Sequence, residues 1–189
     1  MLNSLIVELT SGDEARAEVV VPALIIFGAD AMPALLDLTR STDPDHRWWA
    51  IRVLAQSPLV RTEDLIPLLS DSATEVRAAT ALALHSHPDE AAIPALIKLL
   101  SDEDSITAQL AGNALVAIGS SSVPNLLEVL KEAKQSARIQ AMRALAEIRD
   151  HRAIPAMMQA MDEESILLHH WANEGLERLG LNMIYLKPE

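Results

Sequence analysis

The chain has 189 residues, of which 50% are hydrophobic but only 3% aromatic, and its formal net charge at pH 7 is -12. It contains no cysteine, which excludes disulfides, thiolate nucleophiles and cysteine metal ligands. The excess of acidic residues argues against nucleic acids and anionic membrane surfaces as partners, because both are bound mainly through Lys and Arg.

The N-terminal stretch, residues 1–16, has no basic start, and Glu8 interrupts its apolar run. This pattern predicts neither a signal peptide nor a membrane-spanning helix. The remaining apolar runs are also shorter than the roughly 20 residues that a spanning helix needs. We therefore expect a cytoplasmic protein with no membrane contact.

A helix-sized pattern recurs along the chain every 30 or 31 residues. Leucines mark one column of this register, at Leu54, Leu84, Leu115, Leu145 and Leu176. A second set of segments begins with proline, which suits the first turn of a helix because its missing N–H leaves no bond unmade. The sequence thus predicts repeating pairs of helices, each with a shorter first helix, a turn rich in Ser and Asp, and a second helix.

In chain order, six such pairs are expected within residues 1–180. Their units are about 1–28, 29–57, 58–87, 88–119, 120–149 and 150–180, and residues 181–189 form an off-repeat tail or cap. In the third unit the proline lies deeper in the first helix, at Pro67, where distortion is expected. The expected helices are 2–10 and 13–27, 31–40 and 43–56, 62–70 and 73–86, 90–101 and 104–118, 121–132 and 135–148, and 151–162 and 164–179.

One helix pair cannot bury both of its apolar faces, so the units must stack around a continuous core. The abundance of alanine in the second helices fits this arrangement, because small side chains let neighbouring helices approach closely. We therefore expect one elongated domain without β-strands.

The segments "SDSATEVRAATALAL" and "KEAKQSARIQAMRALAEI" resemble HEAT repeats of the short type named after phycobilisome lyases. The resemblance covers about residues 13–179 and implies an all-α, right-handed α-α superhelix (a HEAT-like α-solenoid). It also implies a polar ladder between a turn acid and an arginine six residues later. Asp71 with Arg77 and Glu132 with Arg138 match it, whereas Arg47 has serine in the acidic slot.

In HEAT-like stacks the second helices line a concave groove, and helical geometry selects the residues that would face it. The resulting surface is apolar and small-sided, with tryptophan near one end, and tryptophan is common in binding hot spots. Packing of Trp48 within the fold is the alternative. The acidic turns would either cap helices or steer a basic partner. The predicted groove residues are Trp48, Ile51, Arg52, Ala78, Ala81, Leu82, His85, Gln109, Asn113, Ile139, Met142 and Arg143.

These features favour a non-catalytic scaffold that binds a protein or peptide in the groove. One alternative, from the resemblance, is a bilin lyase subunit or phycobilisome-handling factor. Another is a metal enzyme like deoxyhypusine hydroxylase, which binds iron through His-Glu pairs. The chain has no His-Glu dipeptide and no phosphate-binding glycine loop. We therefore expect no catalytic residues, metal or cofactor.

Overall fold

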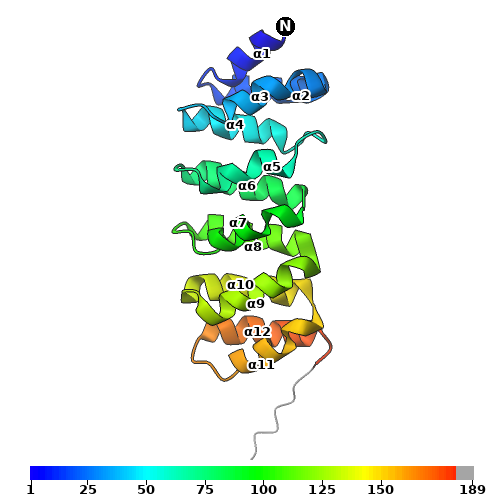
Figure 1. Cartoon of the computed structure of the whole chain (residues 1–189). Coiled ribbons are helices and arrows are strands. Elements are labelled where there is room, and N and C mark those ends of the chain that lie inside the picture. The colour runs from blue at the N-terminus through cyan, green and yellow to red at the C-terminus, as the bar shows by residue number, and fades with distance from the viewer. Residues whose placement is uncertain (182–189) are drawn as a thin grey trace, which may run out of the picture. The chain divides into compact units, whose positions relative to one another are not determined.

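The computed structural model describes residues 1–181, and over this range the chain is built from helices and turns without β-strands. The chain divides into two compact units, Met1–Ala95 and Leu96–Glu189. Figure 1 labels their helices in chain order. The prediction of an all-helical repeat fold is thereby confirmed. The predicted tail, residues 181–189, lies outside the described residues apart from Leu181.

The first unit consists of three helix pairs whose bounds agree closely with the predicted ones. In the third pair the first helix tightens into a 3-10 helix, η2, that contains Pro67, so the expected distortion is present. The elements are α1 (Leu2–Leu9), α2 (Glu14–Phe27), η1 (Gly28–Asp30), α3 (Met32–Leu38), α4 (Pro44–Leu54), α5 (Thr62–Leu65), η2 (Ile66–Ser70), α6 (Thr74–Ser86) and η3 (Glu90–Ala92).

The second unit repeats this plan, and α7 carries the chain from the first unit into it. The 3-10 helices again lie next to the proline-initiated first helices, as they do in the first unit. The elements are α7 (Ile93–Leu99), α8 (Ser105–Ile118), η4 (Gly119–Ser122), α9 (Val123–Glu132), α10 (Gln135–Ile148), η5 (His151–Ala153), α11 (Ile154–Ala160) and α12 (Ile166–Arg178).

Each unit is held together by packing of successive second helices. α4 packs between α2 and α6 in the first unit, and α10 packs between α8 and α12 in the second. Burying an aliphatic side chain stabilises a fold by about 1.5–3 kcal/mol, and the alanines allow the close approach that excludes water around it. Residues buried in these seams include Ala50, Ala83, Ala111, Ala114, Ala141, Ala144 and Ala172.

Within the described residues, the stretch Ser105–Glu132 is long and apolar enough to span a membrane, and a bent pair, Glu14–Asp30 with Met32–Leu38, also passes when taken together. In the first stretch, Gly119 has φ 83° and separates α8 from α9. Ala111 and Leu115 of α8 and Leu126 of α9 are buried. The apolar character of this stretch is that of helices forming a protein core.

Candidate functional site

Aspartates in the turns before α2, α4 and α8 cap those second helices. The side chain of Asp13 accepts the N–H of Arg16, and that of Asp104 accepts the N–H of Thr107 at 2.7 Å. Asp43 likewise caps α4 by accepting the N–H of Asp45. A helix start leaves N–H groups without partners, so capping by itself explains the acids at these positions.

The predicted polar ladder exists in the first unit, but its register differs from the expected one. The carboxylate of Asp71 accepts from Nε and Nη2 of Arg47, both at 2.7 Å, and not from the side chain of Arg77 six residues later. Arg77 instead donates from Nη1 to the main-chain carbonyl of Asp71 at 2.9 Å. Similarly, Nη1 of Arg47 donates to the carbonyl of Ser41 at 2.8 Å. Each arginine therefore binds the carbonyl of its own turn, and Arg47 binds the carboxylate of the next turn.

Burial raises the pKa of Asp71, but the hydrogen bonds from Arg47 and from the Ala73 N–H outweigh burial and leave that pKa below its usual value. The Arg47 and Asp71 side chains are only 11% and 9% exposed. The two residues therefore form a nearly buried, bidentate link between α4 and the turn that precedes α6.

The second unit contains the same kind of contact, and it corrects the predicted role of Glu132. Nη2 of Arg138 donates to both carboxylate oxygens of Glu163, at 2.5 and 2.8 Å, and Nε donates to the carbonyl of Leu130. Glu163 lies one repeat after Glu132, so the ladder again joins an arginine to the following turn. By the same spacing, the residue that would contact Glu132 is Ala108, whose side chain is uncharged.

The predicted groove residues are not all accessible. Ile51, Ala81 and Met142 are buried, with 1%, 0% and 1% of their surface exposed, so their assignment to an open face is corrected. These three share one column of the repeat, one residue beyond the buried alanines. The predicted groove face therefore wrongly included the repeat position that follows the buried alanines. Arg52, Leu82, His85 and Gln109 are exposed, and Trp48, Ala78, Asn113, Ile139 and Arg143 are half-buried.

Two of the predicted groove arginines hold neighbouring second helices together. Arg52 of α4 forms an ion pair with Glu18 of α2 at 3.3 Å. Arg143 of α10 donates to the side chain of Asn113 at 2.7 Å and to the carbonyl of Gln109 at 3.0 Å, both on α8. A Cβ at Gly112 would lie 3.1 Å from Nη2 of Arg143, so the missing side chain makes room for this contact. Arg52 and Arg143 therefore stabilise the packing of the second helices that form the predicted groove.

Sequence reasoning missed exposed apolar side chains at the start of two second helices in the second unit. Ile106 of α8 is 64% exposed and Leu167 of α12 is 53% exposed. They lie one turn before Gln109 and His170. Ile106 and Leu167 occupy equivalent positions of the repeat, where the first unit has Glu75. Apolar residues at a position that is acidic in another repeat were the signal that could have identified them.

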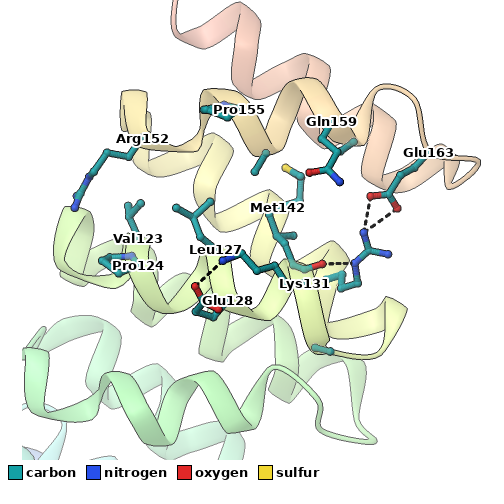
Figure 2. A pocket seen from close by; sticks show the side chains of 15 residues that line it. Val123, Pro124, Leu127, Glu128, Lys131, Met142, Arg152, Pro155, Gln159 and Glu163 are labelled. Carbon is teal, nitrogen blue, oxygen red and sulfur yellow. Dashed lines mark hydrogen bonds and ion pairs between the residues drawn. The ribbon is translucent and has the colours of Figure 1, made fainter.

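A groove of about 1020 Å³ in the second unit is bordered by α9 and α11. Figure 2 shows Leu127 of α9 and Pro155 of α11 on its two sides, with Met142 of α10 between them. Met142 thus lines the side of the first helices instead of the predicted groove. No residue pattern in the sequence pointed to this cavity.

The charges around this groove are paired with one another. Lys131 and Glu128 form an ion pair of 2.8 Å with both side chains more than 60% exposed. Arg152 binds Asp150 at 2.7 Å and lowers the pKa of that carboxyl well below its usual value. Arg138 is fixed by Glu163. Glu163 lies at the opposite end of the groove from Arg152 (Figure 2). An anionic ligand would thus meet one exchangeable cation, Lys131, and two cations, Arg152 and Arg138, that are held by partly buried carboxylates.

A second cavity, of about 480 Å³, lies in the first unit beside the turn between α1 and α2. Trp48 and Trp49 both line it, together with carboxylates. Their rings meet edge to face with centroids 4.9 Å apart. Trp48 therefore borders a cavity near the helix starts, next to acidic side chains.

The histidines are dispersed over the described residues. The Nε2 atom of His87 lies 2.9 Å from the carbonyl of Ala55, and the rings of His170 and Trp171 meet edge to face with centroids 5.0 Å apart. In the part of the chain that the structure describes, no group of three or more His, Asp or Glu side chains is arranged to hold a metal ion.

The repeat geometry and the ladder define the class of protein, and comparison with known families agrees. The model for HEAT repeats matches residues 62–134, and the model for the PBS lyase HEAT-like repeat matches residues 137–163. This chain is a HEAT-repeat protein that carries a PBS lyase HEAT-like repeat. The resemblance seen in the sequence is thereby confirmed.

Three curated relatives share these repeats. Bilin biosynthesis protein RpcF of Synechococcus sp. (strain WH8020) is 36% identical over 95 residues, 50% of this chain and 44% of that protein. Phycocyanobilin lyase subunit beta of Nostoc sp. is 38% identical over 85 residues, 45% and 42% of the two chains. The phycobilisome maturation protein of Synechococcus elongatus is 34% identical over 111 residues, 58% and 53%. The match spans about half the length of these relatives.

Solved structures share the fold. The structure of the complex of CpcE and CpcF of phycocyanin lyase from Nostoc sp. includes a chain that superposes with a TM-score of 0.59 at 22% identity, covering 76% of this chain and 96% of that one. A designed armadillo repeat protein superposes with a TM-score of 0.54 at 18% identity, covering 95% and 100%. At these identities the likeness establishes the helical solenoid fold alone.

Proposed function

We propose that the chain is a HEAT-repeat subunit that acts on phycobiliproteins, as a bilin lyase subunit or a related phycobilisome-handling factor. One observation carries the proposal: all three curated relatives, at 34–38% identity, are named for bilin biosynthesis, bilin attachment or phycobilisome maturation. This was the alternative in the sequence analysis, and it now has better support than a scaffold for an unspecified peptide.

In this role the chain binds a protein partner. The relative of known structure was solved as a complex of two proteins, CpcE and CpcF. Exposed apolar side chains on the second helices, Leu82 in the first unit and Ile106 and Leu167 in the second, offer contacts of the kind that protein interfaces bury.

The groove bordered by α9 and α11 is the place where we expect the bilin to lie. Its volume of about 1020 Å³ is at the upper end of ligand pockets, and its walls combine aliphatic with charged and polar side chains. A linear tetrapyrrole combines an apolar conjugated body with two carboxylates. Lys131 can reach such a carboxylate by exchanging its solvent-exposed ion pair with Glu128, which contributes little to stability. The guanidinium of Arg152 also borders the groove, but its partner Asp150 is only 15% exposed, so this second pair is held more firmly.

We propose that this subunit positions bilin and protein and leaves bond formation to its partners. The chain has no cysteine nucleophile. Its carboxylates at the helix starts act as caps. The subunit would thus contribute proximity and orientation, which can account for a large share of a rate enhancement.

Absorbance spectroscopy tests the proposal directly. The purified chain is mixed with phycocyanobilin, first alone and then with an apo-phycobiliprotein and a CpcE-type subunit. We expect a shifted, sharpened bilin band in at least the complete mixture, because a bound bilin loses conformational freedom. An unchanged spectrum in every mixture would refute the proposal.

A matched pair of variants tests the location of the bilin. Leu127→Glu places a charge on the wall of the α9–α11 groove, and Val7→Glu places the same charge at an exposed position of α1 in the first unit. We expect the first change to abolish the spectral shift and the second to leave bilin binding intact. Circular dichroism establishes that both variants are folded. Equal loss in both variants, or loss only in Val7→Glu, would exclude the groove as the bilin site.

A further inference from the structure

The cavity beside the turn between α1 and α2 combines aromatic rings with carboxylates. Trp48 and Trp49 contribute two perpendicular indole rings, and both residues are half-buried. Glu14, from the first turn of α2, and Asp43 and Asp45, from the start of α4, line the same space. The cavity therefore offers negative charge and electron-rich ring surfaces together.

In the part of the chain that the structure describes, no arginine or lysine forms an ion pair with these carboxylates. Among the described residues, neither Glu14 nor Asp45 forms an ion pair, and Asp43 has only a 3.6 Å contact with His46. Four arginines of the first unit are bound to other acids, in the pairs Arg16–Glu8, Arg47–Asp71, Arg52–Glu18 and Arg61–Asp64. The capping bond of Asp43 occupies Oδ1, and Oδ2 lies 3.6 Å from Nε2 of His46, which also lines the cavity.

We infer that this cavity is a docking site for an arginine side chain of a partner protein. The planar guanidinium group stacks on an indole ring while its N–H groups donate, in the plane of the group, to carboxylates at its edge. The volume of about 480 Å³ accommodates such a side chain. The site lies within the first unit, well apart in sequence from the residues of the proposed bilin groove.

Other cations fit the cavity less well. Over the described residues, the acids are not arranged to share one metal ion. A lysine ammonium is a compact, strongly hydrated charge, and it lacks the flat surface that stacks on tryptophan. Complementarity of charge and shape therefore selects arginine.

Nuclear magnetic resonance of the three indole N–H groups tests the inference. The ¹⁵N-labelled chain, assigned with Trp→Phe variants, is titrated with N-acetyl-arginine methylamide and separately with the citrulline analogue, which has a similar shape but no charge. We expect the Trp48 and Trp49 signals to move with arginine in the millimolar range and to move little with citrulline. The Trp171 signal, from the second unit, should stay in place.

Charge-neutral variants complete the test. Glu14→Gln and Asp45→Asn should each weaken the arginine titration by about two- to fivefold, the scale of an exposed ion pair. Asp37→Asn, which removes an exposed carboxylate of the same unit outside the cavity, should leave the titration unchanged. Equal shifts with citrulline, equal movement of Trp171, unchanged affinity in both cavity variants, or the same shifts on adding Mg²⁺ would each overturn the assignment. Because no bilin is used, such a failure would leave the proposed lyase role standing.

Discussion

The two units contain the same arginine–carboxylate contact at different depths. In the first unit Arg47 and Asp71 are 11% and 9% exposed, whereas in the second Arg138 and Glu163 are 25% and 31% exposed. Both contacts join a second helix to the turn of the next repeat. An ion pair gains strength as water is excluded, but losing one partner then costs more. The repeat therefore determines the geometry of the contact, and local burial determines how much the contact contributes to the free energy of unfolding.

The largest effect is expected from Asp71→Asn in the first unit. The substitution leaves the Arg47 guanidinium nearly buried without its counter-charge, and we expect a loss of about 3 kcal/mol in the free energy of unfolding. Urea denaturation followed by tryptophan fluorescence measures the loss, because Trp48 and Trp49 report on this unit. The double variant Arg47→Met, Asp71→Leu serves as the control and should recover most of the stability, since an apolar pair leaves no buried charge. A loss below 1 kcal/mol in Asp71→Asn would contradict the assigned burial.

The same contact predicts a pH dependence. The pKa of Asp71 is lower in the folded chain than in the unfolded one, so its contribution is fully present above the unfolded value of about 3.9 and is lost as the pH falls through the folded value. The difference in unfolding free energy between wild type and Asp71→Asn should therefore be constant from pH 5 to 7 and shrink below about pH 4. Denaturation series at several pH values check this, and a difference that grows on acidification would show the opposite linkage.

A smaller effect is expected from Arg138→Met in the second unit. Its pair with Glu163 is partly solvated, and water can replace the lost hydrogen bonds, so we expect a loss of about 1 kcal/mol. Trp171 fluorescence follows unfolding of this unit. If Arg138→Met costs as much as Asp71→Asn, burial does not set the weight of these contacts.

The sequence was sufficient to predict the helices, because proline starts, acidic caps and a period of 30–31 residues all act locally. It did not determine the partner of each ladder arginine. Asp71 lies six residues before Arg77 and 24 residues after Arg47, and both separations recur along the chain. Only the stacking of one repeat on the next brings Arg47 to the carboxylate.

The accessible face was also only partly predictable. In an alanine-rich helix, hydrophobicity marks the buried side weakly, because small residues are tolerated on every face. The error of one position that placed Ala81 and Met142 in the open groove arose in this way. Cavities depend on how side chains from separate helices meet, so the α9–α11 groove and the space beside Trp48 left no signal in the residue pattern.

The smallest effect is expected at Glu132, and it tests the register of the ladder. Arg138 binds the acid of the following turn, so the arginine that could bind Glu132 would have to stand at position 108, which is alanine. Glu132 is exposed, and Glu132→Gln should change the unfolding free energy by less than about 0.5 kcal/mol, whereas Glu163→Gln should match Arg138→Met. Urea denaturation of the two glutamine variants side by side compares the two positions. A loss of unfolding free energy in Glu132→Gln alone would mean that Arg138 binds Glu132 of its own repeat. The contact of Arg138 with Glu163 could then no longer be compared with that of Arg47 and Asp71.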